Sequence, residues 1–434
     1  MISIRLSFIL KNLKNHLFPP ASLRRAILFF FFPNLRKYTK NPKVTKSRLE
    51  KPESATEPLF RNMQSDKHPK RVLVLDDRIP DPTFGAGFPR AFEILRILAE
   101  NGFQVTFFPT LYQNREQIAD DLERIGVEVI YRKSKLFNLV FSSFLKKRKG
   151  VYDIVIISRP HNMKFLYKTA VKYCPKAKIV YDAEAIFCLR EIGLFELATG
   201  KLLSSPERQR YINQELNIAV KADHIFTVSQ SEKRLFQNKK LNHCEILNHC
   251  VTPYFSLKKF SEREGILFIG SISPGSPNED ALIYFFTEIL PGIVKSLPVK
   301  VTVVGEVSSR KMIEYSSENV VFTGKIDEIK QYYNESKLFI SPHRIASGIP
   351  LKVCEASANG IPVVATPLIA DQLSWQNGKD ILIGKSPDEF CEKCLQLLHN
   401  QSKWEEIRNN AFKKVTEEYS RERFRNTLLK SMDI

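Results

Sequence analysis

Residues 341–367 read SPHRIASGIPLKVCEASANGIPVVATP. The apolar run just before them, 338–340, predicts a strand, and Pro350 is placed to open a helix. Lys352 and Glu355 lie three residues apart, so a helix puts them on one face near its start. Free N–H groups and the helix dipole attract phosphate there, and the lysine adds positive charge. The carboxylate of Glu355, one turn further on, can accept hydrogen bonds from the paired hydroxyls of a sugar. This helix end could therefore hold a pyrophosphate and a ribose together.

The run 348–366, GIPLKVCEASANGIPVVAT, resembles the donor-binding signature of retaining GT-B glycosyltransferases of the family four type, glycosyl transferases group 1. The resemblance implies that Lys352 contacts the donor diphosphate and Glu355 the ribose hydroxyls, with Gly348 in the same binding motif. Family members often carry another glutamate eight residues before the one that corresponds to Glu355. This chain has Ser347 at that position. The alternative interpretation is an ordinary helix with a surface Lys–Glu pair.

The chain length and charge favour a two-domain enzyme with a basic front end. A chain of 434 residues exceeds one ordinary core. Twelve of its 66 Lys and Arg residues, and only Glu50 of its 47 acids, fall within residues 1–51. We find no nucleic-acid-binding motif, so no nucleic-acid partner is expected. Seven scattered cysteines indicate a reducing compartment, and the pair Cys391 and Cys394 fits a buried helix face better than a metal site.

Residues 1–38 combine helical apolar spacing with lysines and arginines, and the apolar run AILFFFF is too short to cross a bilayer. This pattern predicts a segment that lies on an anionic membrane surface, so we expect a cytoplasmic protein, peripheral on the inner face of the cell membrane. A disordered tail, or a helix packed on the main body, is the alternative. Residues 39–70, polar and dotted with prolines, predict a flexible linker.

From residue 71 onward, apolar strands alternate with amphipathic helices, and the pattern restarts near residue 259. This predicts an α/β fold with two Rossmann-like domains, over 71–258 and 259–402. The resemblance implies that the first is the acceptor domain and the second the donor-binding domain. The resemblance implies the GT-B arrangement, in which the domains face each other across a cleft. It also implies that helices within 403–434 return to the first domain, where Phe424 and Leu428–Leu429 offer an apolar face.

Glycines and charged residues at strand ends complete the candidate donor site. Gly270 ends a predicted strand. The resemblance implies an Arg and a Lys on the loop after it to hold the diphosphate, but neither lies between Gly270 and Asp280. Arg344 is therefore expected to join Lys352 in holding the diphosphate and stabilising the departing charge. The resemblance implies that a loop with Gly85 and Gly87 approaches the donor phosphates from the first domain.

Candidate residues for the acceptor side follow other strands of the first domain. His161 is expected to hydrogen-bond the transferred sugar or the acceptor; a histidine bonded to backbone at a helix start is the alternative. Asp182 and Glu184 are further acceptor-side candidates, and His249 could face the cleft without an assigned role. Asp76-Asp77 predicts a strand-end turn, so we expect no metal ion.

The predicted function is transfer of a sugar from a nucleotide-sugar donor to a glycan or lipid-linked acceptor, with retention of configuration and no further cofactor. Several stretches, including DDRIPDPTFGAGFPR and SPNEDALIYFFTEILP, resemble a bacterial subgroup that acts in surface polysaccharide assembly. Two alternatives stay open: a GT-B sugar-nucleotide epimerase, and a non-catalytic sugar-nucleotide-binding subunit.

Overall fold

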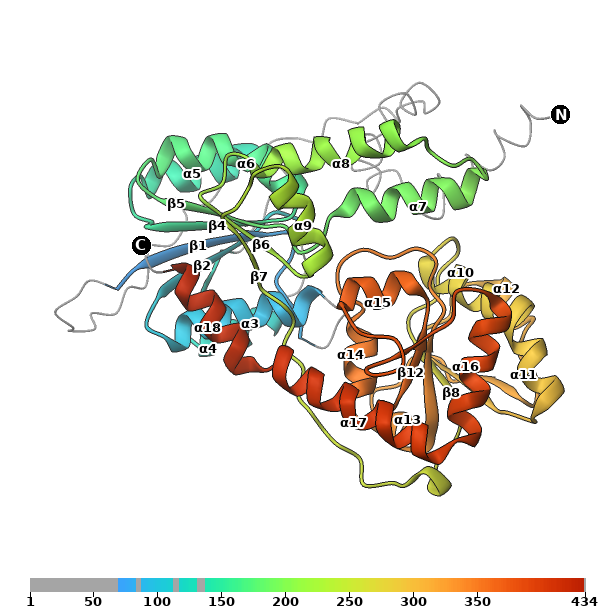
Figure 1. The fold of residues 1–434 in the computed structure, drawn as a ribbon. Helices are drawn as coiled ribbons and strands as arrows, with labels where there is room; N and C mark the ends of the chain where they lie inside the picture. Colours follow the sequence, from blue (N-terminus) through green and yellow to red (C-terminus); the bar gives the residue numbers. More distant parts are fainter. Residues whose placement is uncertain (1–68, 83–86, 112–116, 131–136, 433–434) are drawn as a thin grey trace.

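The computed structural model describes residues 69–82, 87–111, 117–130 and 137–432. Segment 1–38 and nearly all of segment 39–70 lie outside these ranges. Within them the chain forms two parallel β-sheets, each covered by helices on both faces (Figure 1). This confirms the predicted α/β fold class with two Rossmann-like domains.

The first sheet has the strand order β3-β2-β1-β4-β5-β6-β7, and all neighbouring strands in it are parallel. Its strands are β1 Arg71–Asp76, β2 Gln104–Pro109, β3 Glu128–Val129, β4 Ile154–Ser158, β5 Lys178–Asp182, β6 His224–Thr227 and β7 Cys244–Ile246. Its helices are α3 Gly87–Glu100, α4 Gln117–Arg124, α5 Phe137–Lys147, α6 Pro160–Tyr173, α7 Phe187–Thr199, α8 Ser205–Ala219 and α9 Gln230–Asn238. Helices α5, α6 and α8 lie on one side of the sheet and α3 and α4 on the other (Figure 1).

The second sheet has the order β10-β9-β8-β11-β12-β13. Its strands are β8 Glu264–Ile269, β9 Val301–Val304, β10 Val320–Phe322, β11 Ser336–Ser341, β12 Val363–Ala365 and β13 Leu382–Ile383. Its helices are α10 Pro277–Tyr284, α11 Leu290–Ser296, α12 Arg310–Ile313, α13 Lys330–Glu335, α14 Leu351–Ala358, α15 Pro367–Leu373 and α16 Pro387–His399. Ser276 caps α10 and accepts a hydrogen bond from the N–H of Glu279.

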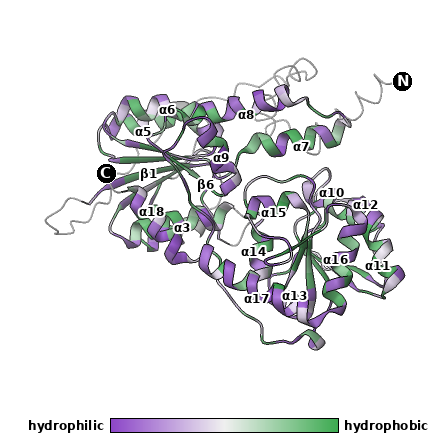
Figure 2. Ribbon diagram, viewed as in Figure 1, coloured by the Kyte–Doolittle hydropathy of each residue, from purple (hydrophilic) through white to green (hydrophobic). Residues whose placement is uncertain are grey.

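The strands are apolar on both faces because helices cover both sides of each sheet, as the hydropathy colouring shows (Figure 2). In β1, four consecutive side chains are buried, from Val72 to Leu75. Burial of such a side chain stabilises the fold by about 1.5–3 kcal/mol. These continuous apolar runs explain why the strands could be recognised from the sequence.

The last two helices connect the domains. Helix α17 (Gln401–Glu418) packs on α14, and α18 (Arg421–Met432) returns to the first domain beside α3 (Figure 1). There Phe424, Leu428 and Met432 join the same buried cluster as Val72 of β1. None of the helices described in the structure is both long enough and apolar enough to cross a bilayer.

Each sheet has one point where the strand order reverses direction, between β1 and β4 in the first and between β8 and β11 in the second. Helices that leave such neighbouring strands depart to opposite faces, so a crevice opens at the carboxyl ends of the strands. Polar loops follow all four strands at these points. They are the places where the fold favours ligand binding.

Candidate active site

Lys352 and Gly270 lie together at the reversal point of the second sheet. Lys352 stands in the first turn of α14, which begins directly after Pro350. Its Nζ lies 3.4 Å from Asn278 Oδ1. A Cβ at Gly270, just after β8, would overlap this ammonium group. The glycine therefore leaves the space that the lysine head group occupies.

The position of Lys352 lowers its affinity for its own proton. Burial lowers the pKa of Lys352 to about 8, and the nearby carboxylate of Glu355 opposes this shift. The ammonium group is thus still charged at neutral pH, while its hydrogen-bond partner, Asn278, is a neutral amide. A partly desolvated cation of this kind gains from an incoming phosphate.

His343 holds this loop together through a chain of hydrogen bonds. Asn278 Nδ2 donates to the carbonyl of Ser271, so its Oδ1 faces His343 Nε2 at 3.0 Å. Burial, with the charge of Lys352, lowers the pKa of His343 to about 3, so the ring is neutral. With Nε2 donating to Asn278, Nδ1 accepts from Ser341 Oγ at 2.9 Å. One amide therefore orients both His343 and Lys352.

Glu355 follows Lys352 on the same face of α14. Burial raises its pKa, while the charge of Lys352 and a hydrogen bond from Tyr333 act in the opposite direction. The Tyr333 hydroxyl donates to Glu355 Oε2 over 3.4 Å. The other carboxylate oxygen can accept hydrogen bonds from hydroxyl groups of a ligand.

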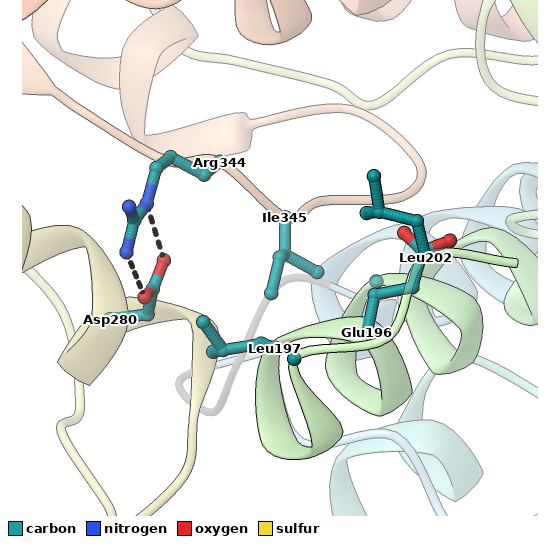
Figure 3. Close-up of a pocket in the computed structure, with 8 residues that line it drawn as sticks. Glu196, Leu197, Leu202, Asp280, Arg344 and Ile345 are labelled. Atoms are coloured by element: carbon teal, nitrogen blue, oxygen red, sulfur yellow. Dashed lines mark hydrogen bonds and ion pairs between the residues drawn. The ribbon is translucent and has the colours of Figure 1, made fainter.

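Arg344 has a different partner from the one expected. Its Nε and Nη2 donate to the carboxylate of Asp280, over 3.2 and 2.5 Å, and its guanidinium lies over the ring of Tyr284. The same side chain lines an open cavity of about 300 Å³ that also contacts Leu197 and Leu202 of the first domain (Figure 3). The structure therefore does not bring Arg344 into the hydrogen-bonded group around Lys352.

A second charged cluster lies at the reversal point of the first sheet. Arg159, directly after β4, bonds Asp76 Oδ1 over 2.7 Å and lies 3.2 Å from Glu184 Oε2. His161 Nε2 lies 2.6 Å from Asp77 Oδ1. Arg159 and Glu184 have φ angles of 74° and 57°, in the left-handed region that residues other than glycine rarely adopt. Such strain is found mostly where function fixes the backbone.

The neighbours of the two aspartates separate their pKa values. Burial raises the pKa of Asp76 to about 6, although Arg159 counteracts the shift. Burial also acts to raise the pKa of Asp77, but hydrogen bonds from His161 and Asn162 and the charge of Arg159 hold it below the usual value. No group of three His, Cys, Asp or Glu side chains suited to a metal ion occurs in the described parts of the chain.

Two of the expected cleft residues are buried below the site. Asp182 is 2% exposed and forms two hydrogen bonds, of 2.7 and 2.8 Å, with the guanidinium of Arg90. His249 is 5% exposed, and burial together with Arg90 lowers its pKa to about 3. Because both side chains are almost completely buried, Asp182 supports the site from beneath, and His249, which could have faced the cleft, does not.

The loop that precedes α14 is held by both domains. The N–H of Gly348, where φ is 75°, donates to Glu232 Oε1 of the first domain over 3.1 Å. Glu232 also accepts from the N–H of Ile186 and from Thr227 Oγ1. A Cβ at Gly348 would lie 3.2 Å from Ala185 Cβ, so a side chain would crowd this contact. The lysine-bearing helix is thus tied to the first domain through its leading loop.

The two remaining predicted glycines lie on the first-domain side. Gly87 begins α3, and a Cβ there would overlap the carboxylate of Glu184. It therefore leaves room for that side chain beside Arg159. Gly85 lies outside the described residues.

Known proteins match both the second domain and the whole fold. Residues 263–400 match the family model described as Glycosyl transferases group 1. The chain is similar to the Anabaena protein HepE, solved in complex with UDP and glucose, with a TM-score of 0.61 at 16% identity, covering 84% of this chain and 99% of HepE. It is also similar to the lipopolysaccharide outer core galactosyltransferase WaaB, with a TM-score of 0.59 at 14% identity, covering 83% and 99%. The chain has the GT-B fold.

A relative of this GT-B protein comes from Klebsiella pneumoniae and is described as an uncharacterized 44.6 kDa protein in the cps region. It is 20% identical over 389 residues, which is 83% of this chain and 99% of the relative. The family match in the second domain and the shared fold together support a glycosyltransferase.

Three residues of the GT-B site were missed by the sequence analysis. Asn278 was quoted only within the stretch SPNEDALIYFFTEILP, and neither Arg159 nor Glu232 was assigned a role. A signal existed for Arg159, because it directly follows β4 and ligands bind at the carboxyl ends of the strands in a parallel sheet. The contacts of Asn278 and Glu232 join segments more than 70 residues apart and left no local pattern.

Proposed function

We propose that this protein transfers a sugar from a nucleotide-sugar donor to a glycan or lipid-linked acceptor, with retention of configuration, during assembly of a surface polysaccharide. The observation that carries the proposal is the pairing of Lys352 and Glu355 on the first turns of α14, facing Gly270 at the reversal point of the second sheet. A cation beside a helix start suits a diphosphate, and a carboxylate one turn further suits a ribose.

The relatives support the substrate classes. HepE was solved with UDP and glucose, which supports a nucleotide-sugar donor. The cps-region relative and the lipopolysaccharide transferase support a surface glycan as the product.

Each domain contributes differently to the proposed reaction. As the bond to the sugar breaks, negative charge grows on the departing diphosphate, and Lys352 and the N–H groups at the start of α14 stabilise it. Stabilisation of charge that develops only in the transition state lowers the barrier. Arg159 and His161, at the edge of the first sheet, hydrogen-bond the transferred sugar or the acceptor.

Retention is proposed without a nucleophile from the protein. Asp76 and Glu184 are each within ion-pair distance of Arg159, and Asp77 is bonded to His161. These contacts hold the carboxylates in place and reduce their nucleophilicity. The departing phosphate then takes the proton of the acceptor hydroxyl on the same face of the sugar, so the new bond forms where the old one broke.

Membrane attachment through residues 1–38 is part of the proposal and rests on their sequence alone. A lipid-linked acceptor would be confined to the membrane, so a basic, apolar front end would raise the encounter rate with it.

The proposal is tested by a thermal-shift panel of nucleoside diphosphates and their sugars, followed by a transfer assay with the stabilising donor. A ligand at a hundred times its Kd adds about 2.7 kcal/mol to the apparent stability. Glu355→Gln should weaken the preferred ligand roughly ten- to a hundredfold, since hydrogen bonds to a charged acceptor contribute about 1.5–3 kcal/mol. Glu335→Gln, at an exposed position of α13, is the matched control.

The products distinguish the proposed function from its alternatives. NMR of the product should show the anomeric configuration of the donor. An epimer formed from donor alone would support an epimerase, and ligand binding without turnover on any donor and acceptor pair would support a non-catalytic subunit.

A further inference from the structure

The positive charge of the described chain is concentrated in one stretch of the first domain. Residues 52–434 contain 54 Lys or Arg and 46 Asp or Glu, a net charge of +8. Residues 137–181 contain ten Lys or Arg and a single acid, Asp153, a net charge of +9. All other residues after position 51 therefore have a combined net charge of −1. The basic character of the chain beyond its front end comes from this stretch.

Most of that charge is on the surface of helices α5 and α6. The exposed lysines of the stretch are Lys146, Lys147, Lys149, Lys164, Lys168, Lys172 and Lys176. An exposed aromatic side chain, Phe165, is 66% accessible and lies among them. In a helix, Phe165, Lys168 and Lys172 follow at spacings of three and four, so they form one stripe along α6. We call this stripe and its neighbouring lysines the α6 face.

Within the described residues, the last two turns of α8 carry no exposed acid. Helix α6 packs between α5 and α8 on one side of the first sheet (Figure 1). The exposed residues in the last two turns of α8, and just after it, are neutral, apolar or basic: Gln214, Asn217, Val220 and Lys221. Asp153 and Asp223, the acids just before β4 and β6, accept hydrogen bonds from the backbone N–H groups of Arg71 and Ile179 at the amino ends of β1 and β5.

We propose that the α6 face docks on the surface of an anionic lipid bilayer. Each lysine near such a surface contributes roughly 1 kcal/mol, and an aromatic ring at its centre can enter the interfacial region. The composition favours lipid over nucleic acid: all seven exposed cations of the stretch are lysines, and none supplies the arginine fork that binds a phosphate bidentately. The face is also a convex helix surface and not a groove.

Docking of this face would bring the membrane to the acceptor side of the cleft. Helix α6 begins at Pro160 and His161, in the charged cluster of the first sheet, and Phe165 follows one turn later. The same helix therefore connects the cleft to the α6 face. This consequence rests on the proposed function, whereas the docking itself does not.

Co-sedimentation of the full chain with vesicles tests the proposal. We expect binding to vesicles that contain phosphatidylglycerol and little binding to pure phosphatidylcholine. Lys168→Gln with Lys172→Gln should weaken partitioning about thirtyfold, the equivalent of about 2 kcal/mol at 1.4 kcal/mol per factor of ten. Lys413→Gln with Lys430→Gln removes the same charge from exposed positions of α17 and α18 and should change partitioning little.

A fluorescent reporter tests insertion directly. The native tryptophans, Trp375 and Trp404, are 5% and 0% exposed, so a tryptophan at the surface will dominate any change in emission on vesicle binding. Phe165→Trp should shift its emission to the blue on phosphatidylglycerol vesicles. Ile313→Trp, at a 62% exposed position of the second domain, should not shift.

Each other outcome overturns the proposal. Equal partitioning of the two double variants would assign membrane binding to other segments, such as residues 1–38. An unshifted Phe165→Trp would exclude contact of this face with lipid. Loss of poly(U) binding in Lys168→Gln/Lys172→Gln, with vesicle binding intact, would assign the face to nucleic acid. Donor stabilisation in the thermal-shift panel is independent of all these results, so the proposed function stands or fails separately.

Discussion

The pKa of Lys352 makes nucleotide binding depend on pH in a predictable direction. The free protein holds this lysine at a pKa of about 8, because burial disfavours the charged form. Only the charged form attracts a diphosphate. Raising the pH from 7 to 9 lowers the charged fraction from roughly nine-tenths to one-tenth, so the apparent Kd for the preferred nucleoside diphosphate should rise about tenfold. Bound diphosphate stabilises the ammonium, so the complex itself stays protonated over this range.

The Lys352→Met variant isolates the contribution of this group. We expect it to bind the nucleotide roughly ten- to a hundredfold more weakly at pH 7, since a charge-assisted hydrogen bond contributes about 1.5–3 kcal/mol. Its Kd should then vary little between pH 7 and 9. Lys385→Met, at an exposed position before α16, should keep both the affinity and the pH dependence of the wild type.

Isothermal titration calorimetry at several pH values measures both effects. If wild type and Lys352→Met weaken by the same factor between pH 7 and 9, the titrating group is on the ligand and not on Lys352. A wild-type Kd that stays constant over this range would refute the role of a desolvated lysine.

Three further predictions follow from buried contacts. Glu232→Ala leaves the N–H of Gly348 without its acceptor, so urea unfolding should show that the free energy of unfolding falls by about 2–4 kcal/mol. Glu232→Gln keeps an acceptor, so an equally large loss in that variant would contradict this. Glu184→Gln removes the charge that faces Arg159, so kcat should fall roughly tenfold while KM for the donor changes little. A change in KM with kcat unaltered would contradict this. His249 is neutral in the folded protein and gains a proton on unfolding below pH 6.5, so the free energy of unfolding decreases as the pH is lowered. Between pH 7 and 4.5 the wild type should lose about 2.5 kcal/mol more of this free energy than His249→Gln. Equal losses in the two proteins would contradict this.

The sequence predicted those features that depend on local pattern. Continuous apolar runs such as Val72–Leu75 identified the strands, and the spacing of Lys352 and Glu355 placed both on one face of a helix. The position of Gly270 after a strand identified the loop that the lysine contacts.

Pairing between distant segments could not be predicted in the same way. Arg344 was expected to face phosphate, but it pairs with Asp280, 64 residues earlier in the chain. Nothing in either segment distinguishes this partner from other acids. The support that Glu232 gives to Gly348 also depends on how the two domains meet, which no local periodicity reports.

The return of α18 to the first domain has a consequence for biosynthesis. Phe424, Leu428 and Met432 fill part of the same apolar cluster as Val72, yet the ribosome adds them after every other residue of that cluster. While the second domain folds, the apolar surface of the first domain that α18 will cover stays exposed to water. Such transiently exposed apolar surface promotes aggregation. A truncated chain that lacks residues 420–434 would keep that surface open permanently, so we expect it to require chaperones or precipitate even though every residue of the candidate site is present.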